Sequence, residues 1–145
     1  MKTLKLFFIA CNILFCCNIL QAQTSSVPSD IISAFKDGDA NRLSAYLNDN
    51  VELVMENNNN IFSKQQTLTI LSDFFKKNKV NGFQVLHQGE KETSNFIIGT
   101  LKTSNDDFRV YILMRKANNK TLILQIRIEK NDESKLQTMD SFMVG

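Results

Sequence analysis

The chain contains a single histidine, His87, within the segment FQVLHQGEKETSNFIIGTL at residues 83–101. The unperturbed pKa of an imidazole, about 6.5, suits both proton transfer and the orientation of a ligand. His87 alternates with Phe83 and Val85, which places it on their side of a predicted strand. If that side faces the interior, His87 is a polar group in an apolar cavity; if Leu86 faces inward instead, His87 lies on the outer surface. The sequence leaves a structural role, ligand contact and catalysis open.

Other groups that carry out chemistry are scarce. Nucleophilic catalysis needs a base beside the nucleophile, and the sequence has no GxSxG-like turn to present a serine. The three cysteines, Cys11, Cys16 and Cys17, all lie in the first 22 residues. A metal site needs three or four ligands, usually including several His or Cys, and the glycines are scattered singly, unlike a phosphate-binding loop. We therefore predict no catalytic residue, no cofactor and no metal site, and a non-enzymatic role is favoured.

The first residues have the layout of a secretory signal peptide. Lys2 and Lys5 form a basic start, Leu6 to Leu20 is an apolar stretch, and a small residue, Ala22, follows. The stretch is short for a membrane-spanning helix, which needs about 20 residues. We predict that residues 1–22 are cleaved and that the chain is exported, to the periplasm or outside the cell. A lipoprotein is the less favoured alternative, because no cysteine of the segment has both a small residue before it and a long enough apolar core.

Cleavage after residue 22 leaves 123 of the 145 residues, a size typical of one domain. The loss of Lys2 and Lys5 leaves 15 of the 17 basic residues against 15 acidic ones, so the formal net charge falls from +2 to zero. A neutral domain has no bulk positive charge with which to attract nucleic acid. We therefore expect no nucleic-acid partner, and no transmembrane segment in the mature chain.

Three helices are predicted after a flexible leader at residues 23–28. Ser29 begins the first, which Gly38 ends, and Asp39 begins a second that runs through ANRLSAYL and includes Tyr46. The clearest helix covers residues 64–77, because Ser63 and Gln66 form a capping box in front of an apolar face. That face consists of Leu68, Leu71, Phe74 and Phe75.

Strands are predicted around the third helix. VELVM at residues 51–55 is followed by four asparagines that suit a turn, and IF begins a short returning strand. Four further strand-like segments suit an antiparallel meander: FQVLHQ, NFIIGTLKT, DFRVYILMRK and TLILQIRIEK. In the last of these we expect Leu122, Leu124, Ile126 and Ile128 to share the inner face.

The predicted fold class is α+β, with helices packed on one face of a curved antiparallel sheet. We expect one cone-shaped domain at residues 29–130, followed by a C-terminal tail at residues 131–145. In the tail, Leu136, Met139 and Phe142 are at helical spacing, and both a docked short helix and a frayed end are open.

This arrangement resembles the cone-shaped fold shared by nuclear transport factor two and ketosteroid isomerase. The segments SKQQTLTILSDFFKKN, FQVLHQG, FIIGTLKTSNDDFRVYILMRK and LQIRIEK are more closely similar to a family of short exported Bacteroidetes proteins of unassigned function in the same superfamily. The resemblance covers about residues 28–130 and implies the fold, an exported location and a dimer formed through the sheet. It brings no catalytic residue. The isomerase relatives use a carboxylate base in a cavity, and Glu52, Asp107 and Glu129 do not match that pattern.

The outer face of the predicted sheet is more apolar than an ordinary solvated face. Tyr111, Leu113 and Ile123 lie on it together with Arg109, Arg115 and Arg127, and these side chains could hold a partner or an anion. We therefore expect a binding module whose partner is a second copy or another protein. The alternative is a small-molecule-binding or enzymatic cone with Tyr46, His87 or Tyr111 in an internal cavity.

Overall fold

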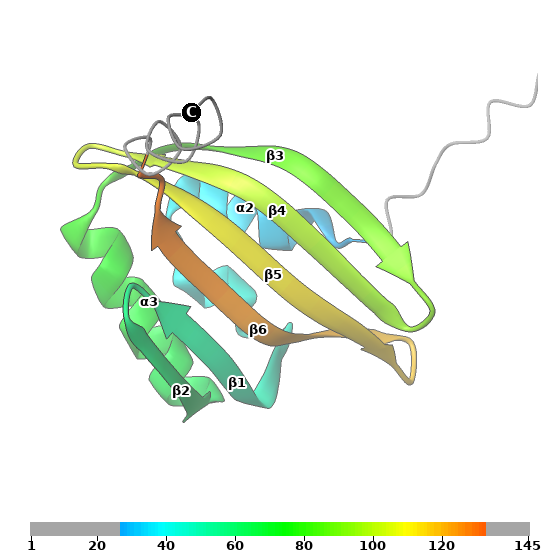
Figure 1. Ribbon diagram of the computed structural model, residues 1–145. Helices are drawn as coiled ribbons and strands as arrows, with labels where there is room; N and C mark the ends of the chain where they lie inside the picture. The colour runs from blue at the N-terminus through cyan, green and yellow to red at the C-terminus, as the bar shows by residue number, and fades with distance from the viewer. Residues whose placement is uncertain (1–26, 133–145) are drawn as a thin grey trace, which may run out of the picture.

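The computed structural model describes residues 27–132 (Figure 1). In chain order its elements are α2 (Ser29–Asp37), the 3-10 helix η1 (Ala40–Leu43), β1 (Leu47–Met55), β2 (Asn58–Ser63), α3 (Lys64–Lys77), β3 (Val80–Lys91), β4 (Ser94–Thr103), β5 (Asp107–Ala117) and β6 (Lys120–Lys130). The predicted signal peptide, most of the predicted leader and the tail from residue 133 onward lie outside the described residues.

The strands form one curved six-stranded sheet in the order β2-β1-β6-β5-β4-β3. Neighbouring strands are antiparallel except β1 and β6, which run parallel. The parallel pair follows from the route of the chain, because α3 leads from the β1–β2 hairpin to the far edge and the meander β3–β6 then returns to β1. The helices lie together on one face of the sheet (Figure 1). The predicted α+β class is confirmed, with this one parallel pairing inside the sheet.

The core lies between the helices and the inner face of the sheet. Phe35 of α2 and Phe75 of α3 meet edge to face, with ring centroids 5.8 Å apart. Fully buried side chains from every layer surround them, including Ile31, Leu71, Val51, Ile97, Leu101, Val110, Ile112, Met114, Ile126 and Ile128. Burial of this apolar surface is the main force that holds the helices on the sheet.

Helix α3 has the predicted bounds and the predicted capping box. The Gln66 N–H donates to Ser63 Oγ at 3.3 Å, and the Ser63 N–H donates to Gln66 Oε1 at 3.0 Å. The predicted second helix, in contrast, is only the single 3-10 turn η1, and Leu47 already begins β1. The helix does not continue through Tyr46, because the Tyr46 carbonyl accepts a hydrogen bond from the Ile123 N–H of β6. Pairing with the sheet thus replaces the helical hydrogen bonds at this point.

The start of α2 also differs from the prediction. Pro28, not Ser29, stands at its N-cap, with φ −57° and ψ 129° and without a side-chain capping hydrogen bond. Val27 belongs to the core and is 4% exposed, so the predicted flexible leader is wrong at its last residues. Gly38 ends the helix as predicted, with the left-handed φ of 64° that glycine adopts without strain.

Two β-bulges change which side chains face the core. The first bulge lies in β6 at Leu124. The neighbouring β5 residues Leu113 and Met114 lie opposite Gln125 and Ile123, so Leu124 has no residue opposite it. Ile123 is therefore buried, so the prediction that it lies on the outer face is wrong. The prediction that Leu122 and Leu124 face inward together with Ile126 is wrong for the same reason. The second bulge lies in β3 at Leu86, between Val85 and His87.

Candidate functional site

The bulge at Leu86 decides the position of His87. Phe83 and Val85 pack against the core, but the extra residue shifts the register so that His87 lies opposite Ile98. Opposite residues of an antiparallel pair share a face, and Ile98 is on the outer face because its neighbour Ile97 is fully buried. His87 is thus an exposed residue of the outer face and does not share the side of Phe83 and Val85, as the simple alternation predicted.

The outer face carries a row of side chains that crosses the sheet. The strand register places His87, Ile98, Tyr111 and Arg127 opposite one another in that order. A second row beside it contains Gly89, Phe96, Leu113 and Gln125.

The rings of Phe96 and Tyr111 stack between these rows, with centroids 6.4 Å apart and planes 24° apart. Ile98, Tyr111, Leu113 and Phe96 are partly buried, with the rest of each side chain open to solvent. We call these four residues the outer apolar patch. They lie at the middle of the sheet, on the face opposite the helices.

The charges around the outer apolar patch are of both signs. Arg127 donates to Glu129 at 3.2 Å, and the register places Arg109 opposite Glu129. Farther along the face, Gln125 donates to Glu52 at 2.8 Å. The arginines that the sequence predicts as a basic patch therefore alternate with carboxylates. Charges of both signs therefore share the outer face.

Tyr46 lies apart from the outer face. Its hydroxyl donates to Asp30 of α2 at 2.8 Å. This hydrogen bond, together with partial burial and the negative charge of Asp30, raises the pKa of Tyr46 above its usual value of 10.0. The predicted site residues thus fall into two groups: His87, Arg109, Tyr111, Leu113 and Arg127 share the outer face, whereas Tyr46 ties α2 to the start of β1.

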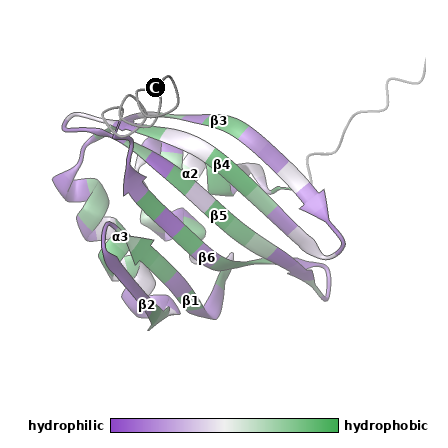
Figure 2. Ribbon diagram, in the orientation of Figure 1, coloured by the Kyte–Doolittle hydropathy of each residue, from purple (hydrophilic) through white to green (hydrophobic). Residues whose placement is uncertain are grey.

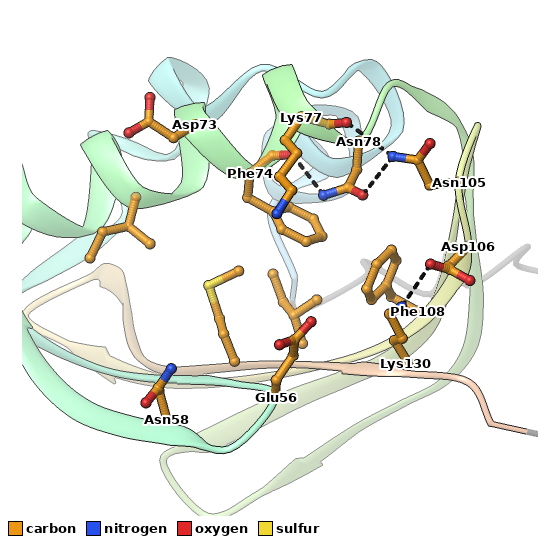
Figure 3. Close-up of a pocket in the computed structure, with 13 residues that line it drawn as sticks. Glu56, Asn58, Asp73, Phe74, Lys77, Asn78, Asn105, Asp106, Phe108 and Lys130 are labelled. Atoms are coloured by element: carbon orange, nitrogen blue, oxygen red, sulfur yellow. Dashed lines mark hydrogen bonds and ion pairs between the residues drawn. The ribbon is translucent and has the colours of Figure 1, made fainter.

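A cleft of about 520 Å³ opens between α3 and the ends of the strands (Figure 3). Its apolar floor and walls come from α3 and from the inner face of the sheet: Met55, Ile70, Phe74, Phe108 and Ile128. The rings of Phe74 and Phe108 meet edge to face with centroids 5.1 Å apart. Deeper in the cone the space is filled, since Leu71, Val110 and Ile112 are fully buried. The cleft is therefore an open mouth and not an enclosed cavity.

Polar groups surround the mouth of the cleft. Lys130 and Asp106 form an ion pair at 3.0 Å, and the Asp106 carboxylate raises the pKa of Lys130. Asn105 donates to Asn78 at 3.1 Å and to the Lys77 carbonyl at 3.0 Å, which joins the end of α3 to the β4–β5 loop.

Three charged side chains of the mouth have no ion-pair partner within residues 27–132: Glu56, Asp73 and Lys77. Figure 3 shows Glu56 on the sheet side of the cleft and Lys77 on the helix side.

The cleft does not contain the residues that the alternative prediction places in a cavity, because neither Tyr46, His87 nor Tyr111 lines it. Sequence reasoning missed it because its walls come from elements far apart in the chain. The one local signal is Phe74, whose position on the predicted apolar face of α3 is correct. Among the described residues no cluster of His, Cys, Asp and Glu is arranged to hold a metal ion. None of the helices described is long and apolar enough to cross a membrane.

Comparisons with known proteins assign this chain to a family. A family model described as a domain of unknown function, DUF4783, matches residues 28–129. A crystal structure of a DUF4783 protein from Bacteroides ovatus has 44% identity and a TM-score of 0.71, and the match covers 73% of this chain and 96% of that one. The family protein from Bacteroides uniformis has 42% identity and a TM-score of 0.71, with 73% and 98% covered. No curated protein matches.

More distant structures share the fold alone. An NTF2-like protein from Cytophaga hutchinsonii has 10% identity and a TM-score of 0.54, with 70% of this chain and 90% of that one covered. The resemblance to a family of unassigned function with the fold of nuclear transport factor two is thereby confirmed. This chain belongs to the DUF4783 family, a family of unknown function with an NTF2-like α+β fold.

Proposed function

We propose that this chain is an exported, non-enzymatic binding domain that associates with a second copy of itself through the outer face of its sheet. The observation that carries the proposal is the outer apolar patch of Phe96, Ile98, Tyr111 and Leu113, which lies on the middle strands and is only partly buried. Aromatic and large apolar residues at the centre of a surface, with charges around them, are typical of protein interfaces.

The mixed charges favour a second copy as the partner. A two-fold interface places the same surface on both sides, so the surface has to complement itself. Arg109, Arg115 and Arg127 lie on the same face as Glu52 and Glu129. A rotation of one copy can therefore bring arginines of one sheet next to carboxylates of the other without an excess of either sign.

The proposed export is supported by the sequence of the first 22 residues. Their basic start, apolar stretch and small terminal residue are those of a cleaved signal peptide, and they contain every cysteine of the chain. A domain without cysteine neither forms disulfides nor depends on the redox state of its compartment.

The proposal is tested on residues 23–145, the chain after the expected cleavage. The crystallised family proteins match 73% of this chain over 96% or more of their own length, so a domain of this extent folds without the first residues. We expect association in sedimentation equilibrium, and a lower mass for the variant Tyr111→Glu/Leu113→Glu, since charges would be buried at the interface. Asn41→Glu adds a charge at an exposed position of η1 and is expected to leave the mass unchanged. Equal masses for the unmodified chain and the double variant, with both folded, would contradict the proposal.

A second candidate function is the binding of a small amphipathic molecule in the cleft. The observation that favours it is the combination of two aromatic rings in the floor with charged groups at the mouth that lack an ion-pair partner within residues 27–132. Pockets with an apolar lining and few convergent polar groups are the usual form of ligand sites.

Anilinonaphthalene sulfonate is a suitable probe for the cleft, because it combines aromatic rings with an anionic group and the cleft is lined by Phe74, Phe108 and Lys77. We expect fluorescence titration to show binding, and Lys77→Met to weaken it about tenfold through the loss of one charged contact. Lys76→Met removes a neighbouring charge of α3 that does not line the cleft, and it should leave the affinity unchanged. Equal losses in both variants would indicate non-specific attraction.

A further inference from the structure

The two edges of the sheet are β2 and β3, and they differ in how they are protected. Exposed backbone groups of an edge strand can pair with another strand, and proteins block this with bulges and charges. Strand β3 has both devices: the bulge at Leu86 interrupts its ladder, and Glu90 and Lys91 stand at its end.

Strand β2 has neither device. Its sequence NNNIFS contains no charged residue and no proline, and its register with β1 is unbroken from Ser63 to Asn58. Asn58 to Ile61 are all exposed, so no element among residues 27–132 covers them. Figure 2 shows β2 as a mostly hydrophilic strand at the margin of the sheet.

Ile61 is the exception within this polar strand. It is 73% exposed, and the only other exposed large apolar side chain of the described residues is Leu86, at 42%. Ile61 lies opposite Glu52 on the outer face. An apolar side chain in that position gains by burial at about 25 cal/mol for each Å² removed from water.

We propose that β2 is a second contact surface, at which the β2 strands of two copies pair antiparallel in a register centred on Ile61. Opposite residues of an antiparallel pair share a face, so the two Ile61 side chains would touch. Asn60 would lie opposite Phe62 of the second copy, and Asn59 opposite Ser63 of the second copy. No like charges meet in this register.

The residues that flank β2 set the direction of this pairing. Glu56 precedes the strand and Lys64 follows it. In an antiparallel pair the Glu56 end of each copy lies next to the Lys64 end of the other, which brings opposite charges together at both ends. A parallel pair would instead place like charges side by side. This charge complementarity selects a second copy of the chain as the occupant.

The edge contact joins the β2 strands, whereas the face contact joins the outer apolar patch on β4 and β5, and two different two-fold contacts on one chain build assemblies larger than a dimer. Sedimentation equilibrium of residues 23–145 therefore tests them together. We expect the unmodified chain to exceed the mass of a dimer, Ile61→Lys and Tyr111→Glu/Leu113→Glu each to give dimers, and the combined variant to be monomeric. Leu86→Lys, which charges the exposed apolar residue of the other edge, should leave the mass unchanged.

The outcomes separate the two contacts. If only the edge contact exists, the unmodified chain is a dimer, Ile61→Lys is a monomer and the variant of the outer face remains a dimer. An Ile61→Lys variant with the mass of the unmodified chain overturns the edge proposal and leaves the face proposal standing. Amide hydrogen exchange gives a second readout: protection of residues 58–63 should rise with protein concentration in the unmodified chain and not in Ile61→Lys.

Discussion

Single side chains set the spacing between β3 and β4. The ring of Phe83 lies over Gly99 on the inner face, so close that a Cβ at Gly99 would stand 2.5 Å from the ring and 2.8 Å from the Gln84 carbonyl oxygen. On the outer face the ring of Phe96 covers Gly89 in the same way, at 2.5 Å. An aromatic ring packed over a glycine of the neighbouring strand restores the contacts that the missing side chain would make. Two glycines thus allow two rings to lie flat on opposite faces of one strand pair.

The crowding at Gly99 predicts a large effect of one methyl group. Gly99→Ala should lower the free energy of unfolding by about 1–3 kcal/mol, because the ring and a backbone oxygen would have to move. Gly82→Ala is the matched control in the same strand pair, since a Cβ at Gly82 has no atom within 4 Å. Its effect should stay within about 0.5 kcal/mol. Urea denaturation of both variants measures the difference.

The cause of the loss can be separated from the general effect of a change in the strand. Adding Phe83→Leu to Gly99→Ala removes the ring, so the combined variant should lose less than the sum of the two single losses. Additive losses would show that the ring does not determine the cost at Gly99.

At the scale of elements, the strongest local signals in the sequence predict the structure best. The capping box of Ser63 and Gln66, followed by an apolar face, predicts α3 at its observed bounds. The four segments of the meander are predicted because polar turns separate them. In these elements the local preference and the tertiary contacts favour the same structure.

The bulges are the elements that the sequence could not predict. Leu86 and Leu124 each stand next to other apolar residues. The sequence pattern is therefore equally compatible with a regular strand and with a strand whose register shifts by one residue. The register is decided by the neighbouring strand, through the opposite pairs of His87 with Ile98 and of Ile123 with Met114. The outer apolar patch was predicted at Tyr111 and Leu113 because β5 alternates without a bulge. The cleft was not predicted because it depends on contacts between α3, β1, β5 and β6.

At the scale of the whole molecule, the hydrogen bond of Tyr46 to Asp30 connects the first helix to the sheet across 16 positions. It also raises the pKa of Tyr46 above 10.0. The folded chain therefore holds the tyrosine proton more tightly than the unfolded chain does. By linkage, the contribution of the bond to stability is complete below pH 10 and is lost as the pH rises through the raised folded-state pKa.

Tyr46→Phe should remove this pH dependence. Below pH 10 we expect the variant to unfold at lower urea concentration, by no more than about 1 kcal/mol because the bond is solvent-exposed. Above pH 10 the two unfolding curves should converge. Tyr111→Phe serves as the control, because the Tyr111 hydroxyl makes no hydrogen bond within residues 27–132. A constant difference between Tyr46→Phe and the unmodified chain from pH 8 to pH 11 would exclude a role for the Tyr46 proton.

The parallel pairing of β1 with β6 has a consequence for the time at which the chain can fold. Glu52 and Gln125, which are hydrogen-bonded across this pair, are 73 positions apart. Strand β6 lies between β1 and β5 in the sheet. Until β6 has been synthesised, the β1–β2 hairpin therefore cannot pair with the strands β3 to β5. Contacts of such long sequence separation form late, because a large loop has to close before they stabilise anything. The complete sheet therefore cannot close until its last strand appears, and such a delay would suit a polypeptide that is threaded through a membrane before it folds.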